Sequence, residues 1–228
     1  PYPISLPGAL PICVVLVQGN NPMLSDFSRW LSEKSAYPVT PIYTESYQAL
    51  SDNLSKNREN LAWTCGVPFV EDHASSGQQL VAVPLFKGKP SYYSLTISRA
   101  GTDKKKLADF RGAVLAYSDP RSNSGFVAPA YALKQQGFDL NTHFRLLLHT
   151  GLHEGSIHAV LNGLADVANV DEYILVEYFK QHPQARAQMV VLERFGPFPF
   201  NPIVAGSGAD KAVVARLQQA LCHRHEEQ

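Results

Sequence analysis

Short apolar runs alternate with longer amphipathic segments along the first part of the chain. Residues 10–17 form a continuous apolar run rich in β-branched side chains, which is typical of a strand buried in a parallel sheet. Residues 22–33 follow as a predicted helix, with one apolar face made by Leu24, Phe27, Trp30 and Leu31. The pattern then predicts a strand at 39–43, a helix at 46–54, and strands at 60–64 and 80–86. This order predicts a parallel sheet covered by helices.

A similar pattern restarts after a strand predicted at 92–98. It predicts strands at 114–117, 144–149, 167–170 and 189–193, and helices at 125–136, 154–162, 173–181 and 209–222. Two α/β patterns without a flexible linker predict an α/β fold of two hinged lobes, with a ligand cleft between them. We expect the lobes to comprise residues 1–94 with 196–228, and residues 95–195.

The composition is that of an ordinary globular protein, and it excludes several classes of function. Hydrophobic residues make up 45% of the 228 positions and charged residues 18%. The formal net charge is zero, whereas a protein that binds nucleic acid needs a basic face to meet phosphates. No run of about 18 apolar residues is present, so no membrane span is expected.

The start of the chain and its cysteines bear on where the protein works. The chain begins at Pro1 rather than Met, as expected after removal of a secretory signal, although a trimmed boundary would look the same. The three cysteines are Cys13, Cys65 and Cys222, an odd number, so at least one has no disulfide partner in the chain. Cys13 lies in an apolar run and is expected to be a small core residue.

The stretch Asp-Pro-Arg-Ser-Asn-Ser-Gly at residues 119–125 carries the strongest chemical signal. It follows a predicted strand directly and precedes a predicted helix. Backbone N–H groups at a helix start point outward, and the helix dipole favours negative charge there. Hydroxyl and amide side chains from Ser122, Asn123 and Ser124 would add donors. The stretch therefore predicts an anion-binding turn, unless the serines only cap the helix.

Two other strand-to-helix turns carry similar chemistry. His153 stands in the turn at 150–156, and a histidine can donate to an oxyanion. Tyr47 stands at the start of the helix predicted at 46–54. Open α/β sheets place their ligands at such turns, so we expect these side chains to contribute to one site.

With these motifs the chain resembles the phosphonate-binding family of periplasmic proteins, which are binding components of ABC transporters for phosphate, phosphite and phosphonate. The family's Asp-Pro followed by Ser-Thr-Ser-Gly is matched at residues 119–125, with Asn123 in place of threonine. The family's Gly-x-His is matched at 151–153, its Asn-Gly-x-Ala-Asp-Val-Ala at 162–168, and the stretch Phe-Asn-Pro-Ile-Val at 200–204 also resembles the family.

The resemblance implies a type II periplasmic binding fold, each lobe a mixed sheet flanked by helices, with a tetrahedral oxyanion held between the lobes. The ligand contacts that it implies are Ser122, Asn123, Ser124 and His153, together with hydroxyl groups from Tyr47 and one of Tyr92 and Tyr93. It also implies a periplasmic monomer without cofactor or metal, which delivers phosphonate, phosphite or phosphate to a membrane permease. A sensor of the same fold, feeding a membrane histidine kinase, is the alternative.

Two departures from the family pattern concern the ligand. Relatives that bind aminophosphonates hold the amine with acidic groups, whereas this chain has Asn201 where an acid is expected, leaving Asp171 as the acidic candidate. Cys65 is expected at the carboxyl end of a strand, where relatives carry no cysteine. It either packs as a small apolar residue or binds a thiophilic ligand such as arsenite, as similar sensors of this family do.

The sequence does not favour an enzyme or a metal protein. It has no Gly-x-Ser-x-Gly elbow, no phosphate-binding Walker loop and no dinucleotide fingerprint. His149, His153 and His158 are close in sequence but do not share a helix face, and no recognised ligand spacing is present. We therefore expect a binding protein without catalytic residues.

Overall fold

The computed structural model describes residues 10–15 and 22–222, which form two compact α/β units. The first unit comprises the described residues up to Pro84 and those from Phe200 onward, and the second comprises Leu85–Pro199. The lobe boundaries expected from the sequence, after residues 94 and 195, stay a prediction. Residues 16 and 17 of the first predicted strand, and Pro1, lie outside the described residues.

The first unit contains a five-stranded mixed sheet in the order β2-β1-β3-β10-β4. Its strands are β1 (Leu10–Val14), β2 (Val39–Tyr43), β3 (Leu61–Trp63), β4 (Gln79–Ala82) and β10 (Ile203–Ala205). β1 is parallel to β2 and β3, while β10 is antiparallel to β3 and β4. The sheet is therefore mixed rather than fully parallel, because β10 runs antiparallel to both of its neighbours.

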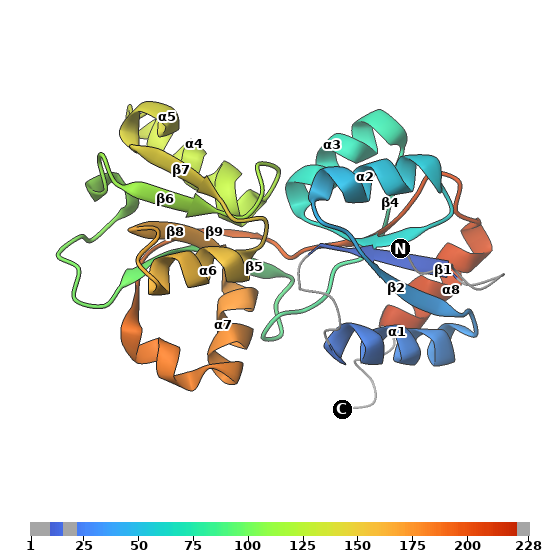
Figure 1. Cartoon of the computed structure of the whole chain (residues 1–228). Coiled ribbons are helices and arrows are strands. Elements are labelled where there is room, and N and C mark those ends of the chain that lie inside the picture. The colour runs from blue at the N-terminus through green and yellow to red at the C-terminus, as the bar shows by residue number, and fades with distance from the viewer. Residues whose placement is uncertain (1–9, 16–21, 223–228) are drawn as a thin grey trace. The chain divides into compact units, whose positions relative to one another are not determined.

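Helices cover both faces of this sheet. Figure 1 shows α2 (Tyr47–Lys56) and α3 (Gly66–Ser76) on one face, and α1 (Pro22–Ser35) and α8 (Lys211–Cys222) on the other. The sequence pattern did not predict α3, because its apolar positions have no clear helical period and only Pro68 and Asp72 are buried in it. Pro68 is tolerated there because it lies in the first helical turn, whose N–H groups need no partner within the helix.

The second unit contains another five-stranded mixed sheet, in the order β7-β6-β8-β5-β9. Its strands are β5 (Ser91–Arg99), β6 (Val114–Tyr117), β7 (Leu146–His149), β8 (Val167–Asp171) and β9 (Met189–Pro199). β6 is parallel to β7 and β8, and β5 is antiparallel to β8 and β9. β9 runs past its predicted end at residue 193, since an edge strand tolerates proline.

Helices also flank this second sheet on both faces. In Figure 1, α4 (Ala128–Gln135) and the short α5 (Leu140–His143) lie on one face, and α6 (His153–Leu161) and α7 (Glu172–Gln181) on the other. Short 3₁₀ helices occupy Leu107–Asp109 and Pro183–Gln188. A buried cluster beneath α4 and α5 contains Leu107, Phe110, Leu115, Leu133, Leu140, Phe144 and Val167. The turns that follow β6 and β7 carry the residues discussed next.

No helix in the described part of the chain is both long enough and apolar enough to cross a membrane.

Candidate functional site

The turn after β6 opens with a wide helical turn capped by Ser122. Residues Asn123–Val127 form one π-helical turn, in which the N–H groups of Phe126 and Val127 both donate to the carbonyl oxygen of Ser122, at 3.1 and 3.0 Å. The Oγ of Ser122 accepts from the N–H of Gly125 at 3.0 Å. Ser122 therefore does cap the helix, but its hydroxyl proton is not used in that bond and can still be donated. Single π-turns of this kind often occur at functional sites.

His153, the first residue of α6, lies buried beside this cap. Its Nδ1 accepts a hydrogen bond from the backbone N–H of Asp171 at 3.3 Å. Its Nε2 lies 3.5 Å from Oγ of Ser122. Burial lowers the pKa of His153 to about 4, so the ring is neutral near pH 7. Because Nδ1 accepts, the single ring proton resides on Nε2, and His153 presents a neutral N–H donor next to Ser122.

Ser124 and Asn123 are held by β5. The carbonyl oxygen of Ser124 accepts from Oγ of Ser94 at 2.7 Å. The Oγ of Ser124 is buried and has no hydrogen-bond partner within residues 10–15 and 22–222. Nδ2 of Asn123 donates to Oη of the buried Tyr92 at 3.2 Å. The structure thus brings Tyr92 to the turn that contains Ser122, Asn123 and Ser124.

Tyr93 and Asp171 are placed differently. Successive residues of a strand point to opposite faces, so Tyr93 does not share the face of Tyr92. Its ring lies 5.9 Å from the guanidinium carbon of Arg194 instead. Asp171 caps α7, with Oδ1 accepting from the N–H of Tyr173 at 2.7 Å. The contact of Asp171 with His153 is therefore made by its backbone N–H.

Ser118 directly follows β6 and is not among the residues that the sequence predicts for the site. Its side chain is 2% exposed, and its Oγ has no hydrogen-bond partner among the described residues. It lies beside Gly125, one of the residues of the π-turn. A hydroxyl residue at the end of a strand could have indicated a donor at this position. Ser118 lies outside the family motif, however, because that motif begins at Asp119.

The two remaining candidates lie in the first unit, each at a helix start that follows a strand. Tyr47 is the buried first residue of α2, which is capped by a bond from the N–H of Ala49 to Oγ of Ser46 at 3.0 Å. Cys65 is the N-cap of α3, is 2% exposed, and makes no side-chain capping bond. Both follow the carboxyl ends of β2 and β3, as the sequence predicted, and their contact with a ligand stays a prediction.

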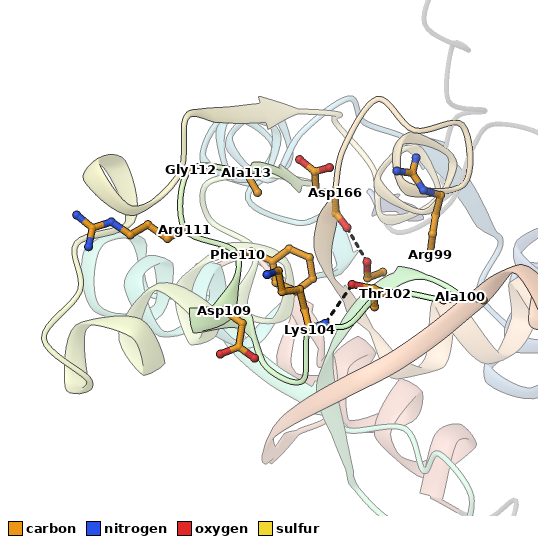
Figure 2. A pocket seen from close by; sticks show the side chains of 12 residues that line it. Arg99, Ala100, Thr102, Lys104, Asp109, Phe110, Arg111, Gly112, Ala113 and Asp166 are labelled. Carbon is orange, nitrogen blue, oxygen red and sulfur yellow. Dashed lines mark hydrogen bonds between the residues drawn. The ribbon is translucent and has the colours of Figure 1, made fainter.

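A pocket of about 500 Å³ lies at the end of the second sheet opposite to these turns, next to the amino ends of β6 and β8. Figure 2 shows Arg99, Lys104 and Arg111 among its lining residues. Both carboxylates that line the pocket accept hydrogen bonds from backbone N–H groups. Asp166 accepts from the N–H of Val114 at 2.8 Å. Asp109 accepts from the N–H groups of Lys105 and Lys106 at 2.9 and 3.1 Å. No residue predicted for the site lines this pocket, and the donors described above lie at the carboxyl ends of the strands.

Comparison with known proteins gives a consistent result. The model of a family described as "ABC transporter, phosphonate, periplasmic substrate-binding protein" matches residues 20–228. The phosphonates-binding periplasmic protein of Escherichia coli (strain K12) is 24% identical over 193 residues, which cover 82% of this chain and 56% of that protein. The chain thus spans little more than half the length of this curated relative.

Two solved structures resemble most of the chain. A binding protein component of an ABC phosphonate transporter from Pseudomonas aeruginosa has a TM-score of 0.80 at 20% identity, covering 92% of this chain and 72% of that one. A protein from Prochlorococcus marinus (MIT 9301) in complex with methylphosphonate has a TM-score of 0.80 at 18% identity, covering 94% and 84%. At these identities the likeness establishes the fold, which is that of the two-lobed periplasmic binding proteins.

Proposed function

Because the chain belongs to the family of periplasmic substrate-binding proteins of phosphonate ABC transporters, we propose that it captures a small phosphorus oxyanion and presents it to a membrane permease. Under this proposal, the protein acts in the periplasm. The proposed ligand is a phosphonate first, with phosphite and phosphate as smaller members of the same chemical class.

The observation that carries this proposal is the group of neutral donors at the start of one helix. Ser122 and Ser124 bring buried hydroxyl groups, and His153 brings an Nε2–H whose proton is fixed by the bond at Nδ1. The first turn of the helix adds outward N–H groups and the positive end of its dipole. Such a set binds an oxyanion through directed hydrogen bonds, without a lysine or arginine among these donors.

We further propose that the substituent on the phosphorus atom of the ligand carries no charge. The Asp171 carboxylate is used as the cap of α7, where it accepts from the N–H of Tyr173. Asn201, an amide where aminophosphonate-binding relatives are expected to have an acid, brings no negative charge. Asp171 is the one carboxylate among these candidates and its Oδ1 already accepts from a backbone N–H, so a primary amine on the ligand would replace its lost hydration only in part, which costs free energy.

The test is a direct binding measurement. Thermal unfolding and calorimetry with methylphosphonate, ethylphosphonate, 2-aminoethylphosphonate, phosphite and phosphate should show stabilisation by the uncharged phosphonates, since a ligand at 100 times its Kd stabilises a protein by about 2.7 kcal/mol. The aminoethyl compound should bind more weakly than ethylphosphonate. The double variant Ser122→Ala/Ser124→Ala should lose binding. If no phosphorus oxyanion stabilises the wild type at millimolar concentration, the proposed function is wrong.

A further inference from the structure

Ser118 carries a buried hydroxyl group that the fold does not use. It follows the last residue of β6, it is 2% exposed, and its Oγ finds no hydrogen-bond partner in the described part of the chain. A buried hydroxyl without a partner costs free energy, since it loses its bonds to water and gains none. Groups of this kind therefore call for an explanation.

The position of this hydroxyl is defined by its neighbours around Gly125. A Cβ built on Gly125 would lie 2.2 Å from Oγ of Ser118, 3.0 Å from Oγ of Ser122 and 3.1 Å from Cε1 of His153. Three polar side chains, two from the turn after β6 and one from the start of α6, thus converge on the space left by the missing side chain. Two of them, Ser122 and His153, are already candidates for the anion site.

Ser124 provides a second, independent indication. Its Oγ is also buried without a hydrogen-bond partner among the described residues, and it precedes Gly125 in the same π-turn. Two hydroxyl groups without partners therefore flank one turn, each able to donate one proton. This is the arrangement expected of donors that receive their acceptor only when a ligand binds.

We propose that Ser118 is a further ligand residue, whose hydroxyl donates to an oxygen of the bound phosphorus oxyanion, and that Gly125 is needed because any side chain there would displace this hydroxyl. The inference rests on the proposed function and adds a specificity residue to it. Ser118 would stabilise the complex, whereas in the ligand-free protein its burial is unfavourable.

A ligand role and a packing role make opposite predictions for the ligand-free protein. If Ser118 binds the anion, Ser118→Ala removes a hydroxyl without a partner, so the ligand-free melting temperature should stay the same or rise. Ser98 is the matched control from the same sheet. Its buried Oγ donates to the carbonyl oxygen of Asp166 at 2.8 Å, so Ser98→Ala should lower the melting temperature and leave affinity unchanged.

The experiment is methylphosphonate titration by calorimetry, with thermal unfolding, for wild type, Ser118→Ala and Ser98→Ala. We expect the Kd of Ser118→Ala to rise about tenfold, as for loss of a hydrogen bond to a charged group. Wild-type affinity in Ser118→Ala, or a drop in its ligand-free melting temperature like that of Ser98→Ala, would overturn the role of Ser118 alone. Failure of the wild type to bind any phosphorus oxyanion would instead overturn the proposed function together with this inference.

Discussion

The backbone N–H of Asp171 donates to Nδ1 of His153 at a distance of 3.3 Å, and this bond fixes which ring nitrogen carries the proton. It joins the end of β8 to the first residue of α6. Since the ring is neutral, the proton must be on Nε2, which faces Ser122 at 3.5 Å. His153 is therefore a neutral donor whose orientation depends on the backbone at the end of β8.

The burial of His153 predicts a loss of stability at acidic pH. Its pKa is lowered to about 4 from 6.5, so between these values the unfolded chain binds a proton that the folded protein does not. The free energy of unfolding should thus be constant above about pH 6.5 and fall by on the order of 3 kcal/mol towards pH 4. Urea unfolding at pH 4.5, 5.5, 6.5 and 7.5 measures this slope.

The control for that prediction is His153→Gln, which keeps an N–H donor but cannot titrate. Burial also lowers the pKa of His143, which adds to the slope in both proteins. The difference between wild type and variant isolates His153. Equal slopes for the two proteins would contradict a buried neutral His153.

Asn123→Asp should separate binding from stability. The aspartate has the same shape but places a negative charge beside the bound anion, so we expect affinity for methylphosphonate to fall at least about tenfold. The same charge lies at a helix start, where it is favourable, so the melting temperature should not fall. Calorimetry and thermal unfolding test both parts.

Tyr92→Phe should lower the binding affinity less than Asn123→Asp does. It removes the hydroxyl that accepts from Nδ2 of Asn123 and should weaken binding only a few-fold. If Asn123→Asp binds as tightly as the wild type, the anion does not lie at this turn.

Gly125→Ala should destabilise the protein, although alanine is usually the better helix former. The added Cβ would come within 2.2 Å of Oγ of Ser118 and 3.0 Å of Oγ of Ser122. Gly66→Ala is the control, since a Cβ there meets nothing within 4 Å and should be neutral or stabilising. Adding Ser118→Ala to Gly125→Ala should recover part of the lost stability in urea unfolding, and no recovery would show that the clash lies elsewhere.

Cys65→Ser should leave phosphonate binding unchanged and the fold intact. Cys65 is the N-cap of α3 but makes no capping bond, and serine is a preferred residue at that position. Arsenite binding by the wild type that is lost in Cys65→Ser would instead identify the thiol as a ligand. In alkylation of the native protein, the exposed Cys222 should react first, while the buried Cys13, whose pKa is raised to about 12, should be protected.

Many of the elements and the position of the donor-rich turn could be predicted from the sequence, whereas α3, α5 and β10 were not. Apolar runs such as residues 114–117 and 167–170 became β6 and β8, because a strand buried in a sheet must be apolar along its length. The cluster from Ser122 to Ser124 lies at a helix start, as predicted, since hydroxyl and amide residues are favoured there.

Other features follow only from contacts between distant residues. The pairing of β10 with β3 and β4 joins residues that the chain separates widely, and no local pattern encodes it. The same holds for the hydrogen bond from Asn123 to Tyr92, which depends on the face that β5 turns towards the π-turn.

The sequence by itself determined where apolar strands, amphipathic helices and polar turns lie, because periodicity and capping are local properties of the chain. Only the tertiary structure decided which turns meet. It placed Ser118, Ser122 and His153 around Gly125, fixed the ring proton of His153 through Asp171, and left the hydroxyls of Ser118 and Ser124 buried without a partner in the described residues. Distances, burial and the direction of hydrogen bonds arise when separate segments pack together, so they cannot be derived from any one segment.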